Sequence, residues 1–397
     1  MTLGSGVLRT WSPLIDQFLV GAASGILLIA GASTMDPDEL GQFGFAYSVV
    51  AVIAVVWRGG FLARQSLIES HVDLLTRLRK SLLVVVATSP FLISAVLAFV
   101  WQVDGREGLT SSTVVVCISL PVVLVYEGLR QALIAANDAR WPLATSTVWL
   151  VVSAGTLGAT WYLQSVLLVL LVWLGAGVIS CVVLWVRADF VVDRRIAAGD
   201  SVVPRGFALP SIQHFNVVAA LPALASLGVA AVALSVAGPT VMAEIVVLNA
   251  VLYPLSVYTQ AVPLLARTLR RQGVSGARVA AFGVVVGSAL WFAAVTWGFP
   301  DLVAVWFGES WDLASGLLWV ATLNLLAGAL VAIEIARLHR LGVSRPIRLV
   351  ILCFSPVRVA AAWIAASLTG SAGWIIAVEF ALHALMWLTL RLTARNA

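Results

Sequence analysis

The chain has 397 residues, of which 61% are hydrophobic and 11% are charged, and its mean hydropathy is +1.02. Soluble domains carry roughly 25% charged residues, so the composition excludes a soluble globular protein and indicates an integral membrane protein. The net charge of +5 would suit nucleic acid, but the arginines fall in alternate short loops between apolar runs, and we therefore expect no nucleic-acid partner.

Apolar runs of about 20 residues match the roughly 30 Å hydrocarbon core of a bilayer. The fold class that they predict is an all-α polytopic membrane protein with twelve transmembrane helices. We expect the spans at residues 11–32, 41–61, 81–102, 112–135, 143–162, 166–186, 208–236, 241–264, 279–299, 313–336, 349–369 and 372–391.

The first loop, at residues 33–40, contains the residues expected at the N-terminus of a helix. Asp36 is followed by Pro37 and then by Glu39, which is the pattern of an N-cap, a proline at the first helical position and an acidic residue at the third. The second span therefore begins next to this turn.

Charges in the later loops alternate in sign along the chain. Arginines such as Arg77 and Arg270 fill every second loop, whereas the loops between them contain acidic residues such as Asp104 and Asp301. Because short basic loops remain in the cytoplasm, we expect both termini to be cytoplasmic.

Short echoes about 200 residues apart indicate an internal repeat. Residues 15–18 recur in part as 212–215, and 62–64 recur as 265–267. We therefore predict two six-helix bundles related by a parallel repeat. The domains expected are an N-terminal bundle at 1–186, a cytoplasmic linker at 187–207 and a C-terminal bundle at 208–397.

Polar side chains and prolines gather in the first, seventh and eighth spans. Kinked helices with polar faces suit the lining of a water-filled cavity, although polar helix-helix packing gives the same pattern. The residues expected to line a substrate cavity, with Arg58 added from the second span, are Asp16, Gln17, Arg58, Gln213, His214, Asn216, Glu244, Asn249, Tyr253 and Gln260.

Ionisable residues inside spans are costly, so they face a partner or a cavity. A carboxylate and a guanidinium three residues apart lie on one helix face and can pair. Arg358 lies near the middle of its span, where it needs Glu379 on the next span or an anionic substrate. The ion or charge-pair sites expected are Glu127, Arg130, Glu334, Arg337, Arg358 and Glu379.

Enzymatic chemistry finds no support in the sequence. The chain has no glycine-rich phosphate-binding loop, its four histidines are scattered, and its three cysteines all lie inside apolar runs. We therefore expect no catalytic residues, no metal site and no cofactor, and we expect the function to reside in the spans and short loops.

Three segments resemble a known family. Residues 35–44 (Met-Asp-Pro-Asp-Glu-Leu-Gly-Gln-Phe-Gly) look like its first outer turn, residues 130–140 like the end of its fourth span, and residues 306–311 (Trp-Phe-Gly-Glu-Ser-Trp) like its loop before span ten. The family is that of the polysaccharide exporters, or O-antigen-type lipid-linked oligosaccharide flippases, of the multidrug/oligosaccharidyl-lipid/polysaccharide exporter superfamily.

The resemblance implies two bundles in a V, with the first, second, seventh and eighth spans lining a central cavity. It further implies a flippase in the bacterial cytoplasmic (inner) membrane that moves an undecaprenyl-pyrophosphate-linked saccharide to the outer leaflet by alternating access. The sequence departs from the family in offering acidic Asp16 and Glu244 beside few cations in these spans.

Two alternatives remain open. The first is an antiporter of the same architecture that exchanges a proton or sodium ion for a small molecule at Asp16 or Glu244. The second is a scaffold without transport activity, whose arginine-rich cytoplasmic loops recruit membrane glycan-assembly enzymes as partners.

Overall fold

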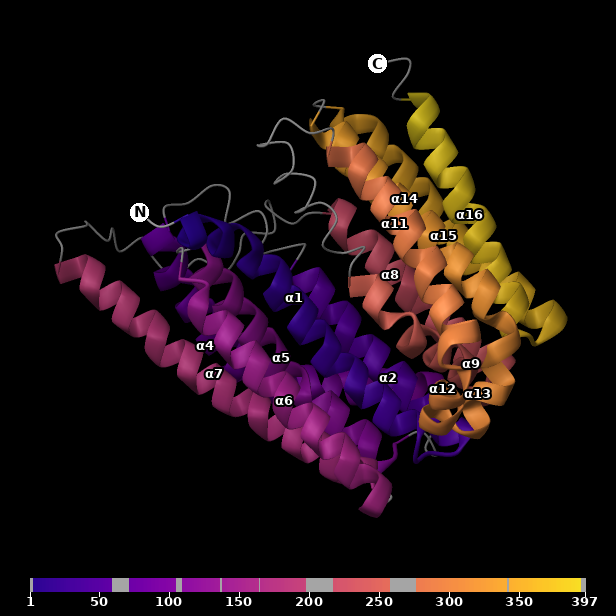
Figure 1. Ribbon diagram of the computed structural model, residues 1–397, viewed down its shortest axis with the longest axis horizontal. Coiled ribbons are helices and arrows are strands. Elements are labelled where there is room, and N and C mark those ends of the chain that lie inside the picture. Colours follow the sequence, from indigo (N-terminus) through magenta and orange to yellow (C-terminus); the bar gives the residue numbers. More distant parts are fainter. Residues whose placement is uncertain are drawn as a thin grey trace. The chain divides into compact units, whose positions relative to one another are not determined.

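The computed structural model describes residues 3–58, 71–104, 109–135, 138–163, 165–197, 217–257, 276–340 and 343–393. Every regular element in these ranges is a helix (Figure 1), which confirms the all-helical prediction for the described chain. The chain divides into two compact units, Met1–Ala23 with Ala46–Ala223 and Ser24–Phe45 with Leu224–Ala397.

The first two helices contribute to both units. Helix α1 (Leu3–Ala32) belongs to the first unit up to Ala23 and to the second from Ser24. Helix α2 (Pro37–Val56) belongs to the second unit up to Phe45 and to the first from Ala46. The predicted linker at 187–207 is helical up to Ala197, and its remainder lies outside the described residues, so the predicted bundle boundaries stay a prediction.

Four long helices form most of the first unit. In Figure 1 they lie side by side, with α5 packed against both α4 and α7, and with α6 packed against α7. The interior is apolar: Leu120, Leu129 and Leu170 are almost completely buried. The helices are α4 (His71–Asp104), α5 (Ser111–Ala135), α6 (Arg140–Leu163) and α7 (Val166–Ala197).

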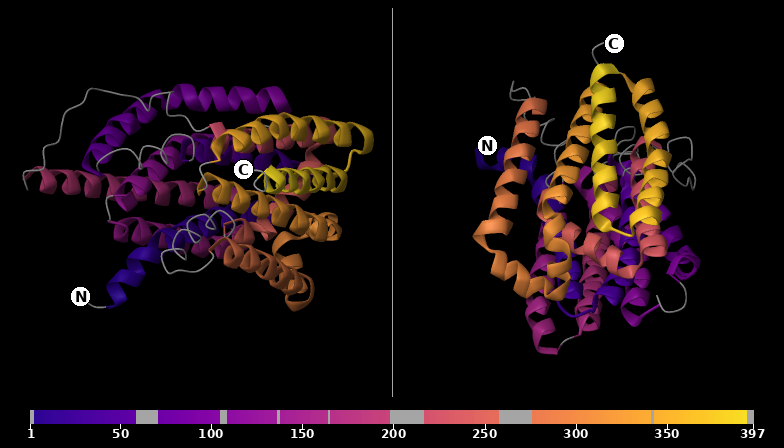
Figure 2. Two further views of the ribbon diagram at one scale, coloured as in Figure 1. Left: turned by 90° about the horizontal axis from the view of Figure 1, so that it is seen from above. Right: turned by 90° about the vertical axis from the view of Figure 1, so that its right-hand side faces the viewer.

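The second unit is assembled around α14, α15 and α16. Helix α16 packs against both of the others, α11 packs against α14, and Figure 2 shows α15 and α16 as a hairpin. The elements are α8 (Val217–Val232), η3 (Ala233–Ala237), α9 (Pro239–Val251), α11 (Gly276–Ala293), η4 (Ala294–Gly298), α12 (Pro300–Phe307), α13 (Glu309–Ala314), η5 (Ser315–Leu317), α14 (Leu318–Arg340), α15 (Ser344–Thr369) and α16 (Ala372–Thr393).

The start of α2 has the cap that the sequence predicts. Helix α2 begins at Pro37, and the backbone N–H of Glu39 donates a hydrogen bond of 2.8 Å to Asp36 Oδ1. The first turn of α2 also contacts α9, because the Thr240 hydroxyl donates to Asp38 Oδ1 over 2.8 Å. The cap starts the helix, and the bond to Thr240 ties this end of α2 to α9 in the second unit.

Ten helices in the described chain are long and apolar enough to cross a membrane. Of the two other expected spans, 143–162 falls in α6, whose 24 residues extend about 36 Å at 1.5 Å per residue. The span expected at 241–264 begins in α9, a shorter apolar helix of 13 residues, and part of it lies outside the described residues. The chain is thus a multi-pass membrane protein, while the count of twelve and the cytoplasmic termini stay predictions.

Candidate functional site

A buried guanidinium lies at the centre of a charged cluster in the first unit. Arg130, in the C-terminal part of α5, is only 1% exposed. Its Nη1 donates to Asp16 Oδ2 at 2.5 Å, and its Nη2 donates to Glu127 Oε2 at 2.6 Å and to Gln17 Oε1 at 3.0 Å. Burying a charge costs several kcal/mol per ion unless it is well paired, so these contacts stabilise Arg130 and join α1 to α5.

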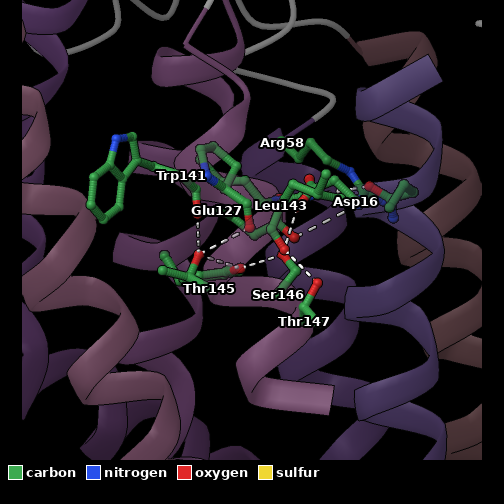
Figure 3. Close-up of polar contacts among 12 residues, drawn as sticks. Asp16, Arg58, Glu127, Trp141, Leu143, Thr145, Ser146 and Thr147 are labelled. Atoms are coloured by element: carbon green, nitrogen blue, oxygen red, sulfur yellow. Dashed lines mark hydrogen bonds and ion pairs between the residues drawn. The ribbon is translucent and has the colours of Figure 1, made fainter. Parts of the chain in front are cut away.

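Asp16 is the second centre of this cluster, which Figure 3 shows. Besides its contact with Arg130, its Oδ1 accepts a hydrogen bond of 2.5 Å from Ser146 Oγ on α6. The hydroxyls of Ser146 and Tyr126 lie 2.6 Å apart. Asp16 is 1% exposed, so a single buried carboxylate connects three helices of the first unit, α1, α5 and α6.

A second guanidinium lies at the edge of the cluster. Arg58, which follows α2, has its Nη1 3.9 Å from Glu127 Oε1, and its side chain is 23% exposed. Together Asp16, Glu127, Arg58 and Arg130 supply two negative and two positive charges. The cluster is therefore electrically balanced when both carboxylates are ionised, and it changes its net charge when it gains or loses a proton.

Aromatic side chains pack against Tyr126, next to the cluster. The ring of Tyr126 packs edge-on against the ring of Trp149, with the ring centroids 4.7 Å apart. The ring centroids of Trp149 and Trp173 are 5.0 Å apart. All three residues are at most 5% exposed, so the Tyr126 side of the cluster is packed against buried aromatic rings. Electrostatic interactions are strengthened in such surroundings because the local dielectric is low.

A second charged group lies in the second unit. Arg358 on α15 pairs with Glu379 on α16, with its Nε 3.0 Å from Oε1, and its Nη2 donates to Ser226 Oγ at 3.3 Å. One turn after Glu379, His383 Nδ1 lies 2.8 Å from Asn324 Oδ1 on α14. These contacts join four helices of the unit by polar bonds.

Within the described residues, the structure brings together three of the ten predicted cavity residues: Asp16, Gln17 and Arg58. Three others, Glu244, Asn249 and Tyr253, belong to the second unit. Glu244 is half-buried and Asn249 is exposed. The ring of Tyr253 packs close to Gly25. Gln213, His214, Asn216 and Gln260 lie outside the described residues, and the cavity itself stays a prediction.

The ion pairs expected from the sequence all form. Glu127 pairs with Arg130, and Arg358 pairs with Glu379. Glu334 and Arg337 also pair at 2.9 Å, but the Arg337 side chain is 43% exposed. Sequence reasoning missed Ser146, Tyr126, Ser226 and Asn324. The run Thr145-Ser146-Thr147 early in an apolar helix is a signal that could have located Ser146.

A metal centre finds no support in the described part of the chain, where no three or more His, Cys, Asp or Glu side chains gather in a group that could hold a metal ion. What the first cluster can do chemically is to exchange a proton or a monovalent cation at its carboxylates, or to present Arg58 to an anion.

Comparison with known proteins shows similarity in structure only. No protein-family model matches the sequence, and no curated protein matches it. An inward-facing multidrug resistance MATE family transporter of the MOP superfamily is 13% identical with a TM-score of 0.59, over 96% of this chain and 95% of that one. An outward-facing structure described in the same terms is 15% identical with a TM-score of 0.55, over 100% and 99%.

A further match is a MOP superfamily transporter from Pyrococcus furiosus, whose description reports a binding pocket of reverse polarity. It is 14% identical with a TM-score of 0.55, over 100% of this chain and 99% of that one. These similarities show that the chain has the fold of MOP superfamily transporters, the superfamily of multidrug, oligosaccharidyl-lipid and polysaccharide exporters that the sequence resemblance names.

Proposed function

We propose that the chain is a membrane transporter that works by alternating access, and that it exchanges a proton or a sodium ion for a small-molecule substrate. The carrying observation is the buried cluster of Asp16, Glu127 and Arg130. The inward- and outward-facing states described for two structural neighbours support the alternating-access part of the proposal.

The cluster suits ion coupling because the guanidinium of Arg130 forms ion pairs with two carboxylates on different helices. When a proton binds Asp16, its ion pair with Arg130 is lost, while the pair between Arg130 and Glu127 within α5 remains. The contact that joins α1 to α5 is thereby weakened. Ion binding at Asp16 thus changes the packing of α1, a conformational response that a coupled transporter needs.

Transport in proteoliposomes tests the proposal. The purified chain would be reconstituted with a pH-sensitive dye inside, and proton flux would be recorded as organic cations are added under an imposed pH gradient. We expect substrate-dependent proton flux in the wild type and its loss in Asp16→Asn. Asp301→Asn, which changes an exposed carboxylate on α12, serves as the matched control and should leave the flux unchanged.

A lipid-linked saccharide flippase is the second candidate. The observation in its favour is the partly exposed Arg58 beside a balanced cluster, because a guanidinium binds phosphate oxygens well. In this case the chain would move an anionic undecaprenyl-pyrophosphate saccharide across a bacterial cytoplasmic membrane. The sequence resemblance to polysaccharide exporters points the same way.

Leaflet-specific labelling in a deletion strain separates the two candidates. Accumulation of lipid-linked saccharide in the cytoplasmic leaflet, relieved by the wild type but not by Arg58→Ala, favours the flippase. Normal lipid-linked pools together with altered tolerance to drugs favour the antiporter. Wild-type behaviour of both Asp16→Asn and Arg58→Ala, combined with loss of function when loop arginines are reversed in charge, would favour the scaffold for glycan-assembly enzymes.

A further inference from the structure

A row of hydroxyl groups leads away from Asp16 within the first unit. Ser146 Oγ donates to Asp16 Oδ1 over 2.5 Å, and Tyr126 Oη lies 2.6 Å from Ser146 Oγ and 3.4 Å from Thr145 Oγ1. Thr145 in turn donates to the carbonyl oxygen of Trp141, at 3.0 Å, in the first turn of α6. The row therefore extends from a buried carboxylate to the end of a helix (Figure 3).

The three hydroxyl residues are shielded from solvent. Ser146, Tyr126 and Thr145 are 0%, 1% and 6% exposed. A hydroxyl group donates one hydrogen bond and accepts others, so a row of hydroxyls can pass a proton along it, whereas a guanidinium has no lone pair that accepts one. The hydroxyl row can therefore carry a proton to Asp16, whereas Arg130 cannot.

We propose that Thr145, Tyr126 and Ser146 form a proton relay that connects Asp16 with the polar end of α6. The proposal rests on the proposed function, in which Asp16 binds the transported proton. It goes beyond that function by assigning the route of the proton and by giving three residues a role that their burial alone does not explain.

Each step of the relay conserves protons and charge. A hydronium ion in the water at the start of α6 gives a proton to Thr145 Oγ1 and becomes water, the Thr145 hydrogen passes to Tyr126 Oη, and the Tyr126 hydrogen passes to Ser146 Oγ. The Ser146 hydrogen then completes the Asp16 carboxylic acid. Each of the three hydroxyl oxygens gains one hydrogen and loses one, so the net change is one proton moved from hydronium, which becomes water, to Asp16.

Thr145 is the residue that turns the relay on and off. Its hydroxyl hydrogen is directed to backbone carbonyls at 3.0 Å, while its contact with Tyr126 is longer, at 3.4 Å. Rotation about the Cβ–Oγ1 bond, which is free for a hydroxyl group, would direct the hydrogen to Tyr126 instead. The arrangement seen here has Ser146 already donating to Asp16, ready for proton delivery.

The charged groups around the relay lie on the side of Asp16 away from Ser146. Arg130 from α5 contacts the carboxylate directly, Glu127 binds the other terminal nitrogen of Arg130, and Arg58 lies beyond Glu127. At the polar end, Asp138 pairs with Arg187 of α7 near the start of α6. The carboxylate of Asp138 is therefore close in sequence to the point where the relay meets water.

The test measures the rate of proton uptake by the purified full chain in proteoliposomes after a rapid drop in external pH. Tyr126→Phe and Thr145→Val each remove one hydroxyl with little change in shape. We expect both to slow uptake by at least about tenfold, with an unchanged final amplitude and an altered solvent deuterium isotope effect. Thr145→Ser restores a hydroxyl and should return the rate to near the wild-type value.

Thr147→Val is the matched control, because Thr147 makes the same kind of bond to the carbonyl of Leu143, at 2.8 Å, but is exposed and outside the relay. Its uptake rate should equal that of the wild type. Asp16→Asn tests the underlying function: if it leaves the amplitude of uptake unchanged, the proton site is wrong. If Asp16→Asn abolishes uptake while Tyr126→Phe and Thr145→Val keep the wild-type rate, the relay is overturned and the proton site stands.

Discussion

Arg358 on α15 holds both carboxylate oxygens of Glu379 on α16, with its Nε 3.0 Å from Oε1 and 3.1 Å from Oε2. Both residues are almost fully buried, at 7% and 6% exposure. The pair occurs in the middle of apolar helices, where neither charge has another counter-ion among the contacts described. The stability of this helix hairpin therefore depends on keeping both partners or neither.

Removing one residue of the Arg358–Glu379 pair is predicted to lower the free energy of unfolding more than removing both. Glu379→Leu leaves Arg358 as an uncompensated buried charge, which typically lowers the free energy of unfolding by about 3–5 kcal/mol. In Arg358→Leu/Glu379→Leu both charges are gone, and most of this loss should be recovered. Thermal unfolding of the four proteins in detergent gives the double-mutant cycle.

The pair of Glu334 and Arg337 is the control for this cycle. It has a similar distance, 2.9 Å, but its cation reaches solvent: the Arg337 side chain is 43% exposed and that of Glu334 is 6% exposed. Glu334→Leu removes the buried carboxylate and leaves Arg337 solvated, so it should change the melting temperature by little. Equal losses in Glu379→Leu and in the double variant would show that the hairpin does not depend on charge pairing.

Close packing between α2 and α9 is predicted to require two glycines. A Cβ placed on Gly41 would lie 2.0 Å from the carbonyl oxygen of Pro239, and one on Gly44 would lie 2.1 Å from Val246 Cγ2. Overpacking of this kind typically costs about 1–3 kcal/mol. Gly41→Ala should lower the melting temperature more than Gly44→Ala, because a backbone carbonyl yields less readily than a valine methyl.

Two variants check this explanation. Val246→Ala combined with Gly44→Ala should recover stability relative to Gly44→Ala alone, since the clashing methyl is removed. Gly155→Ala on α6, where a Cβ meets nothing within 4 Å, should be neutral or slightly stabilising. A loss of stability in Gly155→Ala as large as that in Gly41→Ala would contradict a steric origin.

The backbone at Gly308 is predicted to exclude side chains more strongly than that at Gly370. Gly308 has φ 53° and ψ −139°, a region that essentially only glycine adopts, whereas Gly370 ends α15 in the left-handed helical region at φ 58° and ψ 26°. The left-handed region costs an L-residue about 1–2 kcal/mol. Gly370→Asn should therefore be tolerated, and Gly308→Asn should lower the melting temperature distinctly.

Some contacts were predictable from the sequence because they depend on local geometry. Glu127 and Arg130 are three residues apart on one helix, and Arg358 has Glu379 on the adjacent span, so both pairs follow from helix periodicity and the cost of a buried charge. The capped start of α2 at Asp36 has the same local origin.

The long-range contacts could not be read in the same way. Asp16 meets Arg130 across 114 positions, and Ser146 reaches Asp16 across 130, because tertiary packing selects which apolar helices become neighbours. Nothing local in the sequence distinguishes these partners from other polar residues in the spans. The division of α2 between two units at Phe45 is likewise a property of packing, since α2 is one uninterrupted helix.

The last prediction concerns Arg187, whose role combines an ion pair with stacking. Its Nε donates to Asp138 Oδ2 at 2.6 Å, and its guanidinium carbon lies 5.7 Å from the Trp141 ring centroid and 5.0 Å from that of Phe190. Lysine keeps the charge but lacks the planar group that stacks on aromatic rings. Arg187→Lys should thus lower the free energy of unfolding by about 1 kcal/mol, the value of a partly exposed cation–π contact.

Asp138→Asn separates the two contributions, because it removes the ion pair and leaves the stacking in place. Raising the salt concentration should reduce the difference between Asp138→Asn and the wild type, since screening weakens the pair, but should leave the effect of Arg187→Lys largely intact. If Arg187→Lys melts at the wild-type temperature while Asp138→Asn does not, charge alone holds the turn between α5 and α6, and the two aromatic rings contribute nothing to it.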